Sequence, residues 1–463
     1  MNQVINPVHQ YDLPFFDATH ADLARGLADW APQQQVDESD DRRACKDWVK
    51  RLGQGGWLRY CVPAGDGGAL GGALPQLDSR ALVILRETLA FHSPLADFAF
   101  AMQGLGSGAI TLAGTPAQQA AYLPAVARGE KIAAFALSEP DAGSDVAAMQ
   151  TRAVKVTAKG VVRDAINKIA PQAINTPANV ENKVEKGQFE DKNDSYGEFY
   201  ALIGVKTWIS NGGLADFYVT FAKTDPAGGI ERGTKGISAF IVDASVQGLD
   251  TSEHINVMAP HPLATLRFDD CQIPASALLG EEGEGFKLAM RTLDIFRASV
   301  AAAALGMARR AMSEALHFAK TRRMFGGTLA DMQLTQAKFG DMAALIDSAA
   351  LLTYRAAWMR DKLGTSTPQT ASAYNRASAM AKLVATENAQ KVIDMALQMH
   401  GGQGVQVGSM VEHLYRDIRS LRIYEGATEV QQLIIGKSVL KDVVIPAKAG
   451  IHGGVCGFPP SRE

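Results

Sequence analysis

The spacing of apolar residues changes twice along this chain, and these changes limit the fold to three successive parts. In the first part apolar residues recur three and four positions apart, as at 81–89, which is typical of helices. From 132 to 275 the chain instead carries short runs rich in β-branched and aromatic residues, such as 217–221 and 265–268. After Pro274 the helical spacing returns. The pattern therefore predicts a β domain between two helical ones.

The C-terminal part predicts a helical bundle. Its first helix presents one long apolar face, and further helices are expected near 331–362, 369–399 and 409–440. We therefore expect an α+β multidomain protein with an N-terminal helical domain at 1–131, a central β domain at 132–275 and a C-terminal four-helix bundle at 276–442.

Two segments show neither the helical nor the strand spacing of apolar residues. Residues 161–198 are polar and aperiodic and contain Pro171 and Pro177, so we expect an insertion at a surface turn. The tail at 443–463 is rich in Gly and Pro, and we expect it to be disordered.

Composition allows a large buried core and excludes some classes of partner. The chain has 463 residues, 47% hydrophobic and 21% charged, which suits a globular protein of more than one domain. Its formal net charge is -3 with dispersed basic residues, so we expect no nucleic-acid partner. The N-terminus has no secretory pattern and no run approaches about eighteen apolar residues. We expect a cytoplasmic protein without a membrane segment.

The four cysteines give no sign of a metal or disulfide site. Cys45, Cys61, Cys271 and Cys456 have no metal-like or redox spacing, and four thiols in so long a chain do not make a disulfide framework. We expect reduced thiols and no metal.

Five short motifs carry the chemistry. Residues 138–145 read Ser-Glu-Pro-Asp-Ala-Gly-Ser-Asp, a turn-rich segment whose backbone can approach a flat or phosphorylated ligand. The others are Trp-Ile-Ser-Asn-Gly-Gly at 208–213, Arg-Arg-Met-Phe-Gly at 322–326, Gln-Met-His-Gly-Gly-Gln-Gly at 398–404 and Ile-Tyr-Glu-Gly-Ala-Thr-Glu at 423–429. In this order they resemble the motifs of the acyl-CoA dehydrogenase family. The resemblance implies that family's fold, with a β-barrel-like central domain, and FAD as cofactor.

The resemblance assigns the catalytic role to Glu425. Removing hydrogen across the α and β carbons of a thioester requires a base for the α-proton, an acceptor for hydride and donors that polarise the carbonyl. Glu425 matches the family's base, and burial against flavin and acyl chain would raise its pKa. Its backbone N–H, next to Gly426 of the substrate site, is expected to donate to the thioester carbonyl. In an arbitrary sequence, a Glu before Gly is more often a helix-capping or solvated residue.

Four other positions bear on the substrate. Some relatives carry the base within 293–297, but the position here is Phe296, which cannot take a proton. Asp294 and Arg297 match positions near the thioester and pantetheine, and an ion pair within the helix is an equally good interpretation. Ser144 matches a position that reaches the CoA moiety.

The resemblance divides the FAD contacts into two sets. The residues for the isoalloxazine ring are Phe135, Leu137, Ser138, Trp208, Ile209 and Ser210. The residues for the diphosphate and adenine are Arg322, Phe325, Gln333, Gln398, Gly401, Gly402, Thr428 and Glu429. Since Arg322, Phe325 and Gln333 would serve the flavin of a neighbouring subunit, we expect a homodimer or homotetramer. A helix C-cap at 401–402 and an exposed basic pair at 322–323 are the alternatives.

The expected reaction converts an acyl-CoA to the trans-2-enoyl-CoA, with flavin N5 accepting the β-hydride and electrons passing to an electron-transfer flavoprotein. The stretch 91–112 is expected to shape the acyl pocket. It contains His92 and Asp97 but no arginine to pair a terminal carboxylate, which disfavours dicarboxylic substrates. An acyl-CoA oxidase or a desulfinase on the same fold is the alternative enzyme. A flavin-containing DNA-binding relative is the alternative of another class, disfavoured by the slightly acidic balance.

Overall fold

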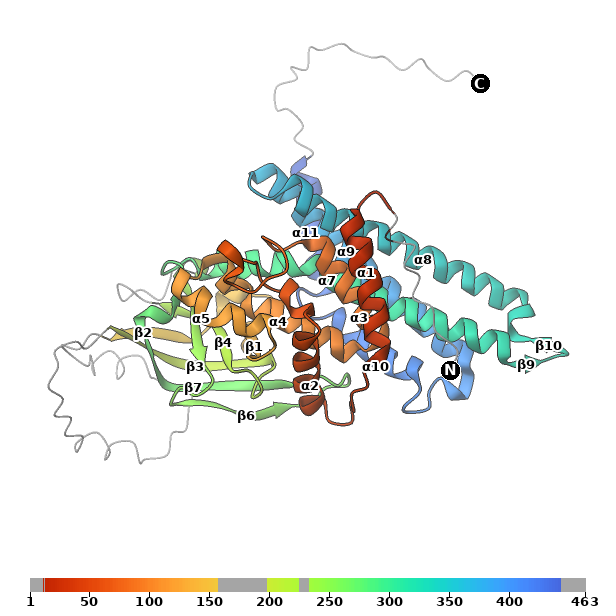
Figure 1. The fold of residues 1–463 in the computed structure, drawn as a ribbon, viewed down its shortest axis with the longest axis horizontal. Helices are drawn as coiled ribbons and strands as arrows, with labels where there is room; N and C mark the ends of the chain where they lie inside the picture. Colours follow the sequence, from red (N-terminus) through yellow and green to blue (C-terminus); the bar gives the residue numbers. More distant parts are fainter. Residues whose placement is uncertain (1–10, 12, 157–197, 225–232, 443–463) are drawn as a thin grey trace, which may run out of the picture.

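The chain forms three parts, and the N-terminal helices lie between the sheet and the C-terminal helices (Figure 1). The computed structural model describes residues 11, 13–156, 198–224 and 233–442. Apart from Glu198, the insertion expected at 161–198 lies outside the described residues, and so does the tail expected at 443–463.

The N-terminal part is helical, and capping side chains fix where its helices begin. Its helices are α1 (Ala18–Trp30), α2 (Asp41–Gln54), α3 (Ser79–His92), α4 (Pro94–Ala113) and α5 (Pro116–Ala127). Asp78 accepts from Ala81 N at the start of α3, and Ser93 accepts from Ala96 N at the start of α4. Nearly every residue of α3 and α4 is buried, because α3 packs against α7 and α4 packs against both α7 and β1.

The central part forms one sheet. Its strands are β1 (Ala133–Ala136), β2 (Arg152–Val156), β3 (Phe199–Ser210), β4 (Phe217–Thr224), β5 (Ile237–Asp243), β6 (Leu249–Ile255), β7 (Leu263–Pro274) and β8 (Leu278–Leu279). Their order is β6-β7-β3-β2-β4-β5-β8, with β1 parallel to β4. The pairing of β3 with β7 shifts register between Lys206 and Ile209, where Trp208 has a φ of 59°. A bulge of this kind redirects a side chain and often lies beside a functional site.

The C-terminal part is a helical bundle built on one 37-residue helix. Its elements are α7 (Gly285–Thr321), the hairpin of β9 (Arg323–Met324) and β10 (Gly327–Thr328), α8 (Gln333–Trp358), α9 (Pro368–His400), α10 (Met410–Leu421) and α11 (Thr428–Asp442). Helix α7 packs against α3 and α4 as well as α8, α9 and α10, so one apolar core runs through both helical parts.

The single helix expected near 409–440 was wrong, because the chain breaks into α10 and α11. Between them Glu425 has a φ of 51° and Gly426 a φ of 90°. Left-handed residues cannot continue an α-helix, and glycine adopts this conformation without strain. The break carries the residue that the sequence analysis placed at the centre of catalysis.

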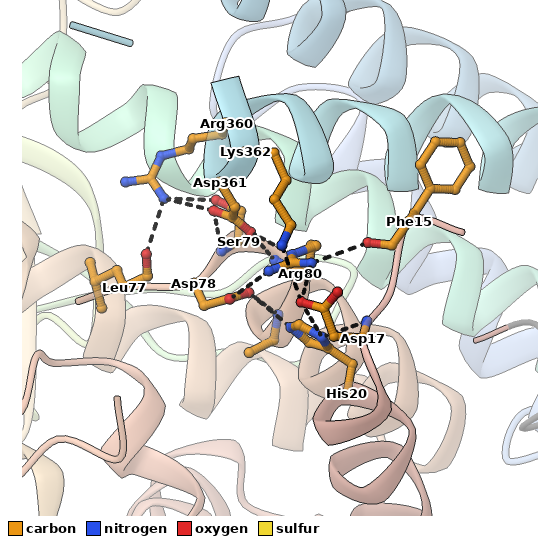
Figure 2. Close-up of polar contacts among 11 residues, drawn as sticks. Phe15, Asp17, His20, Leu77, Asp78, Ser79, Arg80, Arg360, Asp361 and Lys362 are labelled. Atoms are coloured by element: carbon orange, nitrogen blue, oxygen red, sulfur yellow. Dashed lines mark hydrogen bonds and ion pairs between the residues drawn. The ribbon is translucent and has the colours of Figure 1, made fainter. Parts of the chain in front are cut away.

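A polar cluster joins the N-terminal helices to the bundle (Figure 2). Asp361 lies in the turn Met359–Leu363 after α8 and accepts from the backbone N–H groups of Ser79 and Arg80, each at 2.9 Å. The Arg80 guanidinium also donates to Asp361 and, at 2.9 Å, to Asp17. The cluster therefore fixes the start of α3 against the end of α8.

The fold class expected from the sequence is confirmed by helical, sheet and helical parts in that order. Cys45, Cys61 and Cys271 are buried and free, and Cys456 lies outside the described residues. In the described part of the chain, no helix is long and apolar enough to cross a membrane. The same residues contain no group of three or more His, Cys, Asp or Glu side chains that could hold a metal ion.

Candidate active site

Glu425 lies in a turn that is closed by contacts at both ends. Thr428 N donates to Arg422 O at 3.2 Å across the turn. Glu387 of α9 accepts from Arg422 Nε at 2.8 Å and from Thr428 Oγ1 at 2.6 Å. These contacts offset the cost of a left-handed conformation at a residue with a side chain, a form of strain that is common at functional sites.

The Glu425 carboxyl is desolvated and not fully bonded. The residue as a whole is half-buried, but its Oε2 has no contact with solvent and no hydrogen-bond partner among the described residues. Burial raises the pKa of this carboxyl, and the cations Arg86, Lys382 and Arg297 act against that rise. The raised pKa expected from the sequence therefore already follows from the packing of the protein.

Phe296 holds the position that the sequence analysis matched to the alternative base of some relatives. Its side chain is 1% exposed and packs against α4, where a Cβ added to Gly104 would lie 2.6 Å from the ring. A Cβ added to Gly108 would lie 3.2 Å from the same ring. The ring fills the α4–α7 interface, so this position offers no proton acceptor.

Asp294 and Arg297 form the ion pair within α7 that the sequence analysis allowed. Arg297 Nη1 lies 2.7 Å from Asp294 Oδ1 and also donates to Asn375 Oδ1 at 2.8 Å. Burial raises the pKa of Asp294, against the effect of Arg297. The buried Arg297 Nε has no partner in the described residues, so one donor is unused. Contact of either side chain with substrate stays a prediction.

The two segments expected to hold the isoalloxazine ring lie next to each other. Thr207 N donates to Ser138 O at 3.0 Å, which ties β3 to the turn after β1. Leu137 and Ile209 are buried, whereas Phe135, Ser138 and Ser210 are half-buried and Trp208 is 58% exposed. A largely exposed indole beside partly exposed hydroxyls fits a flat aromatic ligand such as flavin.

A buried ion pair missed by the sequence analysis anchors these segments. Lys206 Nζ of β3 donates to Glu139 Oε1 at 2.8 Å and to Leu137 O at 3.0 Å. Glu139 also accepts from the backbone of Gln150 and Thr151. Burial would raise the pKa of Glu139, but Lys206 and these donors outweigh it and lower the pKa. Glu139 stood in a quoted motif, yet no local signal identified a lysine 67 positions away as its partner.

The flavin segment is connected to the Glu425 turn through the loop before β7. Ser210 pairs with Leu263, and Asn211 N donates to Pro262 O at 3.0 Å. A small cavity beside this loop is lined by its residues Ala259, Pro260 and His261 and, across the cavity, by Asp97 and Tyr424. Tyr424 directly precedes Glu425. One chain thus brings the proposed ring site close to the proposed base.

The diphosphate and adenine set is divided between two places. The β9–β10 hairpin lies at the far end of the bundle from the sheet (Figure 1), with Arg322, Phe325 and Gln333 exposed there. Phe318 and His400 stack at 4.4 Å, which brings Gln398, Gly401 and Gly402 to the same end. Phe325 is 88% exposed. Within one chain the hairpin is therefore separated from β3, the strand that carries Trp208.

The last expected contacts are nearer the base. Thr428 begins α11, and its hydroxyl is already engaged by Glu387. Glu429 is exposed on the same turn of α11, and Ser144 is exposed on the loop after β1. No ligand contact of these residues is tested by the structure of one chain.

A buried arginine also faces Glu425. Arg86 of α3 is 2% exposed and binds both carboxylate oxygens of Asp97, at 2.8 and 2.9 Å. Its third contact, Ser299 Oγ at 3.0 Å, is on α7. Arg86 lies outside the window 91–112 that the sequence analysis searched, so its role was missed. A signal was present in the pair of opposite charges on two nearly apolar helices.

Comparison with known proteins agrees with this geometry. Residues 19–130, 179–271 and 283–440 match the family models for the N-terminal, middle and C-terminal domains of acyl-CoA dehydrogenase. The middle match begins within the expected insertion at 161–198. The turn at 138–145 lies outside all three matches, so its assignment depends on its contacts with β3.

Two relatives cover most of the chain. The mitochondrial short-chain specific acyl-CoA dehydrogenase of Homo sapiens is 33% identical over 432 residues, 91% of this chain and 90% of that protein. A subunit of the caffeyl-CoA reductase-Etf complex of Acetobacterium woodii is 33% identical over 396 residues, 85% of this chain and 89% of the subunit.

A solved structure extends the similarity to three dimensions. The acyl-CoA dehydrogenase of Bacillus anthracis in complex with FAD has a TM-score of 0.76 and 26% identity, covering 95% of this chain and 70% of that one. This chain therefore belongs to the acyl-CoA dehydrogenase family of FAD-dependent oxidoreductases that act on a CH–CH group.

Proposed function

We propose that this enzyme removes hydrogen across the α and β carbons of an acyl-CoA thioester, giving the trans-2-enoyl-CoA, with Glu425 taking the α-proton. The observation that carries the proposal is Glu425 Oε2, which is desolvated and has no partner in the described residues. A base needs a lone pair that no other donor occupies, and a raised pKa makes a carboxylate a better proton acceptor near neutral pH.

The main chain of the turn suits polarisation of the thioester carbonyl. The N–H of Glu425 has no backbone acceptor among the described residues, so it is available to donate to that oxygen. Such a bond would stabilise the negative charge that builds up as the α-proton leaves. FAD, when bound, supplies the acceptor for the β-hydride, since no side chain has this chemistry.

The remaining site residues have binding roles in this proposal. Ser138 and Ser210 would donate to the flavin ring, and Trp208 would cover one of its faces. Arg297, with its unused Nε, and Asp294 would contact the thioester and pantetheine end. Ser144 would reach the CoA moiety from the exposed loop after β1.

Electrons would pass to an electron-transfer flavoprotein. The relative that is a subunit of an Etf complex supports this acceptor. The alternative is an oxidase. Fast reoxidation by electron-transfer flavoprotein with slow oxygen uptake would support a dehydrogenase, whereas rapid oxygen uptake during turnover would assign an oxidase.

An assembly of subunits would complete the cofactor site. Arg322, Phe325 and Gln333 would serve the flavin of a neighbouring subunit, and in Figure 1 the β9–β10 hairpin lies at the opposite end of the molecule from the sheet. Phe325 is 88% exposed and Leu334 is 81% exposed at this end. Large apolar side chains so exposed are typical of a contact surface. A homodimer or homotetramer would cover them.

The proposal is tested by Glu425→Gln, which keeps the shape of the side chain but cannot accept the α-proton. Acyl-CoA should still bind and perturb the flavin spectrum, while anaerobic bleaching should slow at least about a hundredfold. Glu284→Gln is the control, because Glu284 is half exposed and pairs with the exposed Lys287. If the flavin of Glu425→Gln bleaches at the wild-type rate, Glu425 is not the base and the proposed mechanism is wrong.

A further inference from the structure

A buried lysine is bonded to the turn that carries Glu425. Lys382 of α9 has 0% of its side chain exposed, and its Nζ donates to Gly426 O at 2.8 Å. Gln431 Nε2 donates to the same carbonyl at 2.9 Å. One main-chain oxygen therefore accepts from a cation and from a neutral amide, both of them buried.

The charges that face Glu425 come from four helices. They are Arg86 on α3, Asp97 on α4, Arg297 on α7 and Lys382 on α9. Arg86 is bound through two bonds to Asp97, and Arg297 is paired with Asp294. Both guanidinium charges are therefore partly offset by a neighbouring carboxylate.

Lys382 differs from these two cations. In the described residues it has no carboxylate at ion-pair distance. The nearby Glu387 is bound by Arg422 and Thr428. The Lys382 ammonium thus acts on Glu425 without a paired carboxylate of its own, whereas Arg86, which lowers the pKa of Glu425 most, is paired with Asp97. A charge acts strongly at short range where protein excludes water.

We propose that Lys382 is a positioning residue for the dehydrogenation: its bond to the Gly426 carbonyl holds the left-handed turn, and its charge keeps the Glu425 carboxylate ionised. This inference rests on the proposed function of Glu425. It resolves a conflict in the site, because burial favours the neutral carboxyl while proton abstraction requires the anion. Burial lowers the pKa of Lys382 to about 8, so the ammonium is present at neutral pH.

The two parts of the role are separated by three substitutions. Lys382→Gln keeps a donor for the carbonyl but removes the charge, Lys382→Arg keeps the charge, and Gln431→Leu removes only the neutral donor. The rate of anaerobic flavin bleaching is measured against pH in each. For Lys382→Gln the acidic midpoint should move up by about one pH unit or more, with bleaching at pH 7 slowed about tenfold and partly restored at higher pH.

The controls should keep the midpoint of the wild-type enzyme. For Lys382→Arg and Gln431→Leu it should stay within about 0.3 pH unit, whatever the effect on the maximal rate. A second measurement needs no turnover: the infrared carboxyl band of Glu425, identified by its loss in Glu425→Gln, should titrate at higher pH in Lys382→Gln. An unchanged midpoint in a folded Lys382→Gln protein would overturn the inference.

If Lys382→Gln does not fold, Lys382→Met and Lys382→Arg still compare a neutral with a charged side chain, and Met also removes the donor to the Gly426 carbonyl. A midpoint in Lys382→Arg shifted as far as in the neutral variant would equally overturn a role for the charge. These experiments distinguish failure of the inference about Lys382 from failure of the proposed function of Glu425. If Glu425→Gln abolishes bleaching while neutral Lys382 variants keep the wild-type profile, only the role of Lys382 is lost.

Discussion

Lys206 Nζ lies 2.8 Å from Glu139 Oε1, and the two side chains are 0% and 4% exposed. This buried pair joins β3 to the turn that would hold the flavin. Removing one member of such a pair leaves an uncompensated charge in the interior, which costs about 3 to 5 kcal/mol. The cost should appear at the flavin site, because both partners bind residues of that turn.

We expect Lys206→Met to lower FAD content and FAD affinity. The charge on Glu139 would lose its partner, and the Leu137 carbonyl beside Ser138 would lose its bond from the Lys206 ammonium. The measurement is flavin per chain after purification, with FAD titration of the apoprotein. Lys155→Met is a matched control, since Lys155 and Glu198 form a pair of the same length, 2.8 Å, that is exposed. Equal FAD affinity in the two variants would contradict the anchoring role.

Gly426→Ala should nearly abolish catalysis. Gly426 has a φ of 90°, which a residue with a Cβ adopts only under strain, and a Cβ there would also displace the Gln431 amide. We therefore expect the turn to shift and to move Glu425. We expect bleaching to slow at least about a hundredfold, the effect of losing a positioned base. Gly436→Ala is the control, because a Cβ at that position in α11 meets no atom within 4 Å. Alanine there should stabilise the helix by up to about 1 kcal/mol and leave the bleaching rate unchanged.

Activity should fall on acidification above the usual range for glutamate. Burial raises the pKa of Glu425, and the base must be ionised, so bleaching is lost as pH falls through this raised value. The effect on stability has the opposite sign. Between the unfolded and folded pKa values the folded chain holds the extra proton, so this carboxyl disfavours folding as pH rises through that window. An acidic midpoint at or below the usual glutamate range would contradict the predicted rise.

Arg322→Ala should weaken FAD binding and assembly together. If Arg322 of one subunit binds the diphosphate of a flavin held by its neighbour, the cofactor stabilises only the assembled form. We expect lower FAD occupancy and a shift toward monomer in analytical ultracentrifugation. The exposed Arg25, paired with Asp22 on α1, provides a control at a site with no proposed ligand. Full flavin content with wild-type affinity in Arg322→Ala would remove Arg322 from the site.

Asp361→Ala should loosen the contact between the N-terminal helices and the bundle shown in Figure 2. It leaves two backbone N–H groups at the start of α3 without their acceptor and removes one of the carboxylates bound by the Arg80 guanidinium, which keeps Asp17. We expect a loss of about 2 to 4 kcal/mol, measured as an earlier first unfolding transition. Asp22→Ala, which removes an exposed ion pair, should change stability by less than about 1 kcal/mol. Equal transitions in both variants would show that the cluster contributes little.

Much of the architecture could be predicted from local pattern. The strands β4 and β7 were recognised from runs of β-branched and aromatic residues, and the long helices from the spacing of their apolar residues. The prediction of one helix at 409–440 failed because the residues around Glu425 do not disfavour a helix strongly enough to reveal where it breaks. The turn there depends on Glu387 and Lys382, which lie on another helix.

The sequence by itself determined the order of the parts and the identity of the family, because periodicity and short motifs are properties of neighbouring residues. It also determined that Phe296 cannot be a base. Only the tertiary structure decided which charges face Glu425 and which of them already have partners. Arg86 and Lys382 reach that carboxyl from two separate helices. Since a pKa depends on burial and on charges within a few ångströms, it is decided by how distant segments pack.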